Sequence, residues 1–441
     1  MAKVALIEPR AEFNGYALFR LPLLGLLYMG TILKQRGHEV VIFVESIHPA
    51  LDDRTGRLDP EVESADVVGL SGMTCTVQRA YALARRIRER NPRARIVMGG
   101  PHVSFVPFEA QRVADVVVTG ECDRRIVEIV ENPDSLQGVI AGDSFVDLDS
   151  LPAPDLGLIK GLRNIRWVPI ATSRGCPYDC RFCSVTKMFG RRYRLRSPEG
   201  ILAEIEQRLG EGHRRFFFYD DNFGIDRQRT QQWLEEVVRR GWRFRWSAQA
   251  RVEIARDEEL LRLMARSGCY YLFIGMESVN PDALRDYRKR QTLEDIRSCV
   301  RRLHRAGIRV HGMFVLGSDS DDEGTALRTV RFCDEEKIDT AQFAILTPFP
   351  GTDLYRDMEA QGRILTRNWS LYDGTHVVFE PLRLKAIELQ RQFLWAWKRF
   401  YRAANLKAFL ISRYLLGRWQ ALNRKFLSAL QAWPARSLDE V

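Results

Sequence analysis

Three cysteines, Cys176, Cys180 and Cys183, lie close together in the segment SRGCPYDCRFCS. Thiolates are ligands of zinc and of iron–sulfur clusters, and a structural zinc requires four protein ligands. The next candidates along the chain, His213 and Cys269, lie well beyond this segment, so zinc is the weaker interpretation. Three thiolates on one loop fit three irons of a 4Fe-4S cluster and leave the fourth iron open, as catalytic metal sites keep an open position.

The composition is that of a globular protein with reduced thiols. The chain has 441 residues, which is too long for one ordinary hydrophobic core and predicts two domains. Of these residues 45% are hydrophobic and 28% charged, as in ordinary globular proteins. The net charge of +10 comes mainly from arginine, without the compact basic block typical of nucleic-acid binding. The first residues have a buried-strand pattern, so we expect no signal peptide, and the most apolar stretch, residues 21–33, is shorter than the roughly 20 residues that span a bilayer. We expect a cytoplasmic protein and leave contact with a membrane surface open.

The first 150 residues alternate short apolar runs with amphipathic stretches. This alternation predicts a Rossmann-like α/β domain, with a parallel sheet covered by helices on both faces. The expected strands are residues 4–9, 38–45, 67–72, 95–101 and 115–121, and the expected helices are residues 21–36 and 76–91. Glycine-containing turns follow the third, fourth and fifth strands at their carboxyl ends, where open α/β sheets bind ligands.

A second alternating series follows, and its first strand leads into the three cysteines. Its expected strands are residues 167–172, 215–221, 243–250, 270–277, 309–317 and 340–348. Its expected helices are residues 198–209, 227–240, 257–267, 292–306 and 322–336. This pattern predicts a TIM-like parallel β/α barrel, complete or partial, with its chemistry at the carboxyl ends of the strands.

These patterns predict four segments. Residues 1–145 form the Rossmann-like domain, 146–165 a linker rich in Pro, Gly and Asp, 166–381 the barrel and 382–441 a helical, basic and aromatic extension. We interpret the extension as packing helices, and a helix lying on a membrane surface is the alternative.

The cysteine loop resembles the CxxxCxΦC motif of radical S-adenosylmethionine (SAM) enzymes, including the aromatic Phe182 before the last cysteine. The resemblance implies a 4Fe-4S cluster held by the three cysteines, with SAM on the open iron. It also implies reductive cleavage of SAM to methionine and a 5′-deoxyadenosyl radical, which abstracts hydrogen from a substrate. Phe182 would then lie near the adenine.

Later barrel segments are similar to the SAM-binding motifs of the same family. They are DDNFGID, WSAQARVE, GMES and GMFVLG, each at the end of an expected strand. The resemblance implies SAM-binding roles for Asp220, Asp221, Ser247, Gln249, Arg251, Gly275, Glu277 and Gly312.

Residues 1–150 resemble the cobalamin-binding domain that precedes the barrel in many radical SAM enzymes. The resemblance is carried by residues 69–105 and 117–123 and implies cobalamin contacts from Ser71, Gly72, Thr74, Thr76, Gly99, Gly100, His102, Gly120 and Glu121. The DxHxxG motif that supplies a cobalt-ligating His after the first strand is absent. We interpret His102 as a turn residue more than as a cobalt ligand, and a domain that only shapes the substrate pocket remains an alternative.

The segments PFPGTDLY and NWSLYDGTHVVFEP resemble a subgroup that includes the anaerobic magnesium-protoporphyrin cyclase and hopanoid-biosynthesis proteins. The resemblance implies methylation, ring formation or rearrangement of a lipid-like, tetrapyrrole or natural-product substrate. A flavodoxin- or ferredoxin-type electron donor is implied as partner.

Two other function classes remain open at this point. One is a non-catalytic corrinoid or iron–sulfur binding or electron-transfer protein, and the other, of lower weight, is an RNA-modifying enzyme. The basic run GRRYRLRSPEG after the cysteines is interpreted as a solvated stretch before a helix capped by Ser197. The alternative is a patch that docks an acidic electron donor or an anionic substrate group.

Overall fold

The computed structural model describes residues 1–13, 21–162, 165–402, 406–433 and 437–439. The chain divides into two compact units, with the boundary between Pro169 and Ile170. No helix in the described part of the chain is long and apolar enough to cross a membrane.

Unit 1 is built around a six-stranded sheet in the order β2-β1-β5-β6-β7-β8, and all neighbours pair in parallel. The strands are β1 (Lys3–Glu8), β2 (Glu39–Val44), β5 (Val67–Ser71), β6 (Arg95–Gly99), β7 (Val116–Thr119) and β8 (Gly138–Ala141). A short antiparallel hairpin joins β3 (Leu51–Asp52) to β4 (Arg57–Leu58). The central strands are runs of buried Val, Ile and Leu, as expected for strands covered on both faces.

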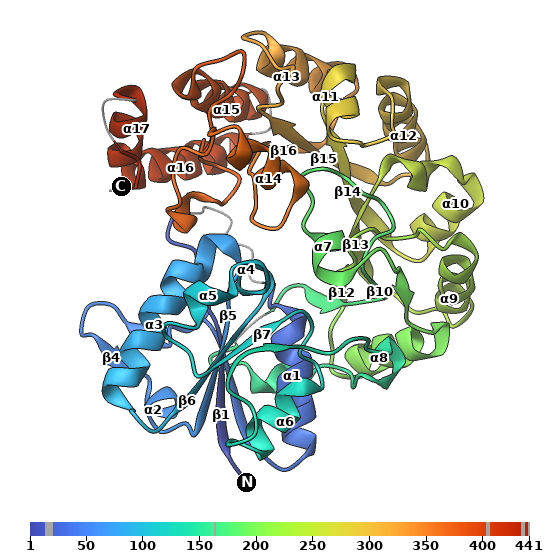
Figure 1. The fold of residues 1–441 in the computed structure, drawn as a ribbon. Coiled ribbons are helices and arrows are strands. Elements are labelled where there is room, and N and C mark those ends of the chain that lie inside the picture. Colours follow the sequence, from blue (N-terminus) through green and yellow to red (C-terminus); the bar gives the residue numbers. More distant parts are fainter. Residues whose placement is uncertain (14–20, 163–164, 403–405, 434–436, 440–441) are drawn as a thin grey trace. The chain divides into compact units, whose positions relative to one another are not determined.

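The helices of unit 1 cover this sheet. They are α1 (Leu24–Gln35), α2 (Pro60–Glu63), α3 (Val77–Arg90), α4 (Pro101–Phe105), α5 (Pro107–Ala110) and α6 (Arg125–Glu131). α1 packs on β1, β2 and α6, while α3 packs on β5 and α2, so the two groups lie on different faces (Figure 1). The Rossmann-like interpretation is confirmed. The added strand β8 was not expected, because its half-exposed sequence GVIA lacks a buried-strand pattern.

Unit 2 contains a second parallel sheet, in the order β16-β15-β14-β13-β12-β9. Its strands are β9 (Val168–Ile170), β12 (Arg215–Phe218), β13 (Arg245–Ala250), β14 (Cys269–Glu277), β15 (Arg309–Leu316) and β16 (Thr340–Ile345). Its helices are α7 (Val185–Phe189), α8 (Pro198–Gly210), α9 (Arg227–Arg239), α10 (Glu258–Arg266), α11 (Pro281–Asp286), α12 (Leu293–Arg305), α13 (Thr325–Glu335) and α14 (Asp353–Ala360). β9 and β16 are the two ends of this order, so the described strands form a partial barrel.

The two faces of this sheet differ because side chains alternate along each strand. One face, with Phe218 and Trp246, is fully buried against helices such as α9, whose Trp233 contacts both rings. The other face, with Phe273 and Met313, is only half-buried. One face of the sheet is therefore buried under helices, and the other, the inner face, is partly accessible.

The C-terminal helices are α15 (Ala386–Arg402), α16 (Leu406–Leu422) and α17 (Arg424–Gln431). α15 packs on β16, α13, α16 and α17, and the three helices gather at the red end of the chain (Figure 1). The segment expected to be a linker contains the 3-10 helices η3 (Leu148–Ser150) and η4 (Leu156–Leu158). η4 packs on β2 and α1, so these residues are part of unit 1.

Candidate cluster, SAM and corrinoid sites

The cysteine loop begins at β10 (Ser173–Arg174), and two acidic residues after β12 fix its start. The N–H groups of Thr172 and Ser173 donate to Asp220 at 2.7 and 3.1 Å, and the Thr172 hydroxyl donates to its other oxygen. Burial raises the pKa of Asp220, and these hydrogen bonds oppose the rise. Asp220, an expected SAM contact, therefore already uses both oxygens to hold the loop. Asp221 accepts from the Gly175 N–H at 2.9 Å and remains exposed.

The other end of the loop is held by different elements. Arg181 forms an ion pair with Asp357 of α14 at 3.0 Å, and its N–H donates to the Tyr287 carbonyl at 3.2 Å. The Phe182 ring lies edge-on to the Tyr287 ring, with 5.3 Å between centroids. Gly175 has φ of 89°, and a Cβ there would lie 2.8 Å from the Arg192 carbonyl, so only glycine fits this turn. Protein contacts thus position the loop from three sides.

The donor set of this loop suits an iron–sulfur cluster. Burial raises the pKa of Cys183 to about 12, and the neighbouring Cys180 and Cys176 add to the rise. Thiolates that raise each other's pKa require cationic partners, which cluster irons supply. Among the described residues, no three His, Cys, Asp or Glu side chains form a ready site for a single metal ion.

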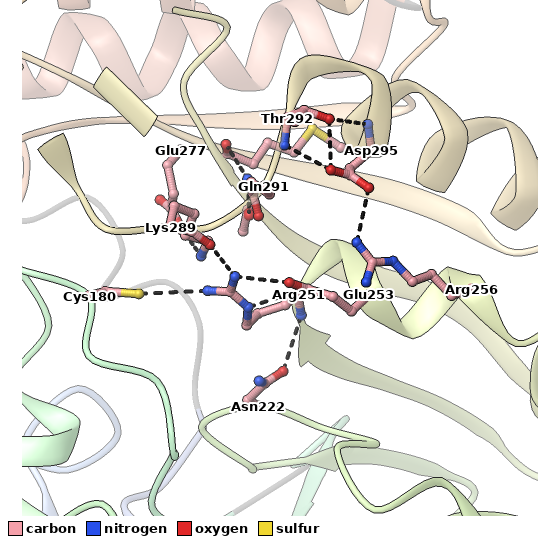
Figure 2. A network of polar contacts seen from close by, with 12 residues as sticks. Cys180, Asn222, Arg251, Glu253, Arg256, Glu277, Lys289, Gln291, Thr292 and Asp295 are labelled. Carbon is pink, nitrogen blue, oxygen red and sulfur yellow. Dashed lines mark hydrogen bonds and ion pairs between the residues drawn. The ribbon is translucent and has the colours of Figure 1, made fainter. Parts of the chain in front are cut away.

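Arg251 is the centre of a polar network beside the loop (Figure 2). Its guanidinium donates to Cys180 Sγ at 3.6 Å, lies 3.9 Å from the centre of the Tyr178 ring, and binds both oxygens of Glu253 at 3.0 and 3.1 Å. Its backbone N–H donates to Asn222 Oδ1 at 3.2 Å. Arg251 therefore joins the carboxyl end of β13 to the cysteine loop.

A buried ion pair lies next to Arg251. Lys289 Nζ donates to Glu277 Oε1 at 2.6 Å, and the Lys289 carbonyl accepts from the Arg251 guanidinium. Glu277 has φ of 61°, at an irregularity in the pairing of β14 with β15. A Cβ on Gly275 would lie 2.7 Å from Glu277 Oε1, so this glycine leaves room for the pair. Gln291 Nε2 donates to the Gly275 and Met276 carbonyls at 3.3 and 2.9 Å.

The remaining predicted SAM residues lie farther from this network. Gln249 and Ser247 share the inner strand face of Arg251, but Ser247 lies about 13 Å toward the amino end of β13. Gly312 lies on the opposite face, because a Cβ there would meet the side chains of Phe314 and Met276 at 2.8 and 3.2 Å. The structure thus brings together Cys180, Arg251, Gly275 and Glu277, and it does not bring Ser247 and Gly312 to them.

Sequence reasoning missed four residues of this network: Tyr178, Asn222, Lys289 and Gln291. Lys289 and Gln291 lie in the run RKRQ, which reads as a solvated basic loop, yet both are buried. Tyr178 and Asn222 could have been found, because they lie in the quoted segments SRGCPYDCRFCS and DDNFGID.

The basic run after the cysteines also differs from the expectation. Arg194 and Arg196 are buried, and Arg196 forms an ion pair with the buried Glu204 of α8. The interpretation of the whole run as solvated is wrong for these two residues, because a distant carboxylate neutralises one of them. Arg191 and Arg192 are exposed as expected, and Ser197 caps α8 by accepting from Gly200 N–H at 3.0 Å.

In unit 1, the turns after β5, β6 and β7 lie at one edge of the sheet. Gly100 has φ of 100°, and a Cβ there would lie 2.9 Å from the Gly72 nitrogen. The Gly72 N–H donates to the Gly99 carbonyl at 2.8 Å, so these two turns pack backbone against backbone. At Gly120 nothing lies within 4 Å of the Cβ position, so this backbone is open to a ligand. Small residues and open backbone fit a broad ligand such as a corrin ring.

The other residues that are predicted to contact cobalamin at this edge are either buried or half-buried. Thr74 and Thr76 are buried, and the Thr76 hydroxyl accepts from Met73 N–H at 3.2 Å, while Ser71 and Glu121 are half-buried. His102 is fully buried, and burial lowers its pKa to about 4. It lies within the short helix α4 and not in a turn, and its interpretation as a residue that does not ligate cobalt stays a prediction.

The profile of the radical SAM superfamily matches residues 170–330, and that of the B12 binding domain matches residues 15–130. An uncharacterized methyltransferase of Synechocystis sp. is 30% identical over 82% of this chain and 68% of its own length. The chain belongs to the radical SAM superfamily. It is a cobalamin-dependent radical SAM enzyme of the methyltransferase or cyclase type, with a 4Fe-4S cluster, SAM and cobalamin as cofactors.

Other radical SAM relatives include the expected subgroup. The anaerobic magnesium-protoporphyrin IX monomethyl ester cyclase of Cereibacter sphaeroides is 26% identical over 94% of this chain and 74% of its own length. The bacteriochlorophyllide d C-12(1)-methyltransferase of Chlorobaculum tepidum is 28% identical over 81% and 79%, and the hopanoid C-3 methylase of Methylococcus capsulatus is 26% identical over 91% and 80%. The radical SAM methyltransferase TsrM of Kitasatospora setae shares the fold, with a TM-score of 0.66, 19% identity and coverage of 96% and 91%.

Proposed function

We propose that this enzyme transfers a methyl group to a carbon atom of a broad, apolar, polycyclic substrate, of the tetrapyrrole or polycyclic lipid class. The observation that carries the proposal is the half-buried inner face of the sheet in unit 2, which lies below the Arg251 network. The names of the relatives support it, because three of them act on bacteriochlorophyllide, magnesium-protoporphyrin ester and hopanoid.

The inner face carries aromatic and apolar side chains together with the polar Ser247, Gln249 and Thr340. The Phe217 and Phe273 rings lie 5.7 Å apart, and the His311 ring lies 4.7 Å from Phe273. Met313 and Val315 continue this face toward the carboxyl end of β15, and both are half-buried. Rings and aliphatic side chains that are half-buried on a sealed sheet are suited to contact a flat apolar substrate.

The residues of the site have distinct roles in this proposal. Cys176, Cys180 and Cys183 hold the cluster, and Arg251 and Glu277 bind the charged and hydroxyl groups of SAM. When bound, the cluster supplies an electron that cleaves SAM, and cobalamin carries the methyl group. Because Lys289 and Glu253 neutralise Glu277 and Arg251, the network can hold a zwitterion without a net charge of its own. Phe182 would contact the adenine, and Gly72, Gly100 and Gly120 would contact the corrin.

An acidic electron donor of the flavodoxin or ferredoxin type is the proposed protein partner. Arg191 and Arg290 both lie near Asp179 of the cysteine loop, at 3.4 and 3.5 Å, and their side chains are 71% and 72% exposed. Exposed cations beside the cluster loop favour an acidic partner. Changing both to Gln should weaken reduction by such a donor and reduce its salt dependence, whereas R262Q on α10 should change neither.

Isotope labelling tests the reaction. The anaerobically reconstituted enzyme is incubated with cobalamin, a reductant, SAM carrying a deuterated methyl group, and pools of tetrapyrroles and polycyclic lipids. Methylation predicts a labelled product together with 5′-deoxyadenosine, and ring closure predicts 5′-deoxyadenosine and a substrate that loses hydrogen without gaining label. A product without label overturns methyl transfer. The triple variant C176A/C180A/C183A should yield neither product.

A further inference from the structure

The positive charge of the chain is concentrated in the C-terminal helices. Residues 389–438 carry ten Lys or Arg and no Asp or Glu, and the whole chain has a formal net charge of +10. The rest of the chain is therefore neutral overall. A run of 50 residues without one acidic side chain is unusual for a solvated surface, where both signs are normally interspersed.

The exposed stripe of α15 is cationic with one large aromatic residue. Its exposed positions are Arg391, Trp395, Lys398, Arg399 and Arg402, which recur at helical spacing. Trp395 is 39% exposed. The opposite stripe, with Phe393 and Phe400, is buried against the rest of unit 2.

The exposed stripe of α16 combines apolar and cationic residues. Leu410, Tyr414 and Leu422 are 56%, 60% and 52% exposed, and Arg413 and Arg418 lie between them on the same side. The Arg418 guanidinium lies 5.9 Å from the centre of the Tyr414 ring. Leucines exposed to this extent at regular spacing on one helix are an unfavourable surface in water.

The orientation of α16 is fixed from its buried side. Trp419 Nε1 donates to Thr375 Oγ1 at 3.1 Å, and Oδ1 of Asn423, the residue that follows α16, contacts His376 Nε2 at 2.6 Å. Both residues that α16 reaches are themselves buried. The leucine and tyrosine stripe therefore cannot rotate inward without breaking these buried contacts.

We propose that the exposed stripes of α15 and α16 dock the enzyme on an anionic lipid bilayer surface. Arg and Lys bind the headgroups, Trp395 and Tyr414 lie at the headgroup level, and Leu410 and Leu422 enter the outer acyl layer. The charge of the segment is complementary to anionic lipids, which attract basic segments. Residues 389–438 contribute no acidic side chain that would repel the lipid, and Asp334 of α13 lies 3.8 Å from Arg399. This inference is independent of the substrate that the enzyme acts on.

Nucleic acid is the less suitable occupant of this surface. A phosphate backbone attracts the arginines, but it offers nothing to the exposed leucines of α16. A second copy of the chain is also less suitable, because two surfaces that each carry only positive charge repel one another.

Vesicle flotation with the full-length, cluster-loaded enzyme tests the proposal. We expect binding to vesicles of phosphatidylcholine with phosphatidylglycerol at least about tenfold stronger than to phosphatidylcholine alone, and loss of that difference in high salt. R391Q/R418Q should lower binding by about fivefold for each charge removed. The vesicle binding that remains in high salt depends on the apolar side chains, and L410S/Y414S should weaken it.

Matched variants serve as controls. R239Q/R262Q removes two exposed cations elsewhere in unit 2, and F108S/L327S removes two exposed apolar residues, so both should leave vesicle binding unchanged. All four variants should still form 5′-deoxyadenosine from SAM, which shows that they are folded and loaded. Equal binding to neutral and anionic vesicles, an absence of binding, or equal loss in the control variants would overturn the proposal. Oligomerisation or RNA binding lost in the same variants, without vesicle binding, would assign the surface to a second copy or to nucleic acid instead.

Discussion

The two parallel sheets of this radical SAM enzyme present the same kind of edge with different chemistry. In unit 1 the edge is formed by Gly72, Gly99, Gly100 and Gly120, whose backbones pack on one another or lie open. In unit 2 the edge carries charged groups, with Arg251 bonded to Cys180 and Glu277 bonded to Lys289. In the proposed assignment, the same position in an α/β sheet would serve ligands of different size and charge.

Ligand chemistry explains this difference. A corrin ring is broad and is recognised by its shape. The protein surface that contacts it must therefore be free of large side chains, and glycine meets this requirement. SAM is small and zwitterionic, so its site needs fixed charges, and buried charges are stable only when paired. We therefore expect changes at the edge of unit 2 to act through charge and changes at the edge of unit 1 to act through shape.

The largest expected effect is a loss of SAM cleavage at the edge of unit 2, with no change in cobalamin binding at the edge of unit 1. C180A removes a cluster ligand and the sulfur that Arg251 contacts, so SAM cleavage should fall by at least about a thousandfold, or about 4 kcal/mol. Cobalamin retention should not change, because unit 1 is untouched. Iron content and 5′-deoxyadenosine formation measure the loss in unit 2, and corrinoid absorbance measures cobalamin retention in unit 1. C333A, a buried cysteine on α13, is the control and should retain iron; equal activity of the two variants would contradict the assignment.

The buried ion pair offers the next test. K289M leaves Glu277 as an unpaired buried carboxylate, which should lower the free energy of unfolding by about 3 kcal/mol. The double variant E277Q/K289M should recover much of that stability, because no unpaired charge remains, yet SAM affinity should stay low. Thermal unfolding and SAM binding measure the two effects. K385M, at an exposed lysine, should be neutral. Recovery of SAM affinity in the double variant would show that Glu277 has only a structural role.

Shape at the edge of unit 1 is tested by G100V. A side chain there would meet the Gly72 backbone and would adopt φ of 100°, so we expect a loss of about 2 kcal/mol in unit 1 and loss of cobalamin binding. SAM cleavage by unit 2 should persist. G25A on α1 is the matched control, because nothing lies within 4 Å of its Cβ position, and it should be neutral or slightly stabilising. Retained cobalamin in folded G100V would contradict the role of this edge.

Local patterns in the sequence were sufficient for most of the fold and for the cysteine loop. Strand limits agree to within a few residues because buried Val, Ile and Phe runs are local signals, and Ser197 caps α8 as expected. Lys289 could not be predicted, because its burial depends on the irregular pairing at Glu277 and on a loop that folds back on Arg251. The burial of Arg196 likewise depends on Glu204 of the following helix. Charge pairs between distant segments leave no pattern in the sequence.

The smallest expected effect compares a buried histidine in each unit. Burial lowers the pKa of His102 in unit 1 and of His311 in unit 2 to about 4. Between about pH 6.5 and pH 4 the unfolded chain binds a proton that the folded chain excludes, so each histidine destabilises its unit as the pH falls, by about 1.4 kcal/mol at about pH 5.5. Glu109 of the neighbouring helix α5 lies 3.9 Å from the His102 imidazole and is an acidic group close to it.

Glu8 complicates this comparison, because burial raises its pKa to about 7 and gives unit 1 a contribution of the opposite sign. The test therefore compares H102Q with the unchanged protein at each pH. Hydrogen exchange of β6 should show H102Q gaining about 1.4 kcal/mol relative to the unchanged protein between about pH 8 and pH 5.5. Exchange of β15, which contains His311, should show no such gain. A gain in β15 as well, or none in β6, would show that the buried imidazole of His102 does not set the acid response of unit 1.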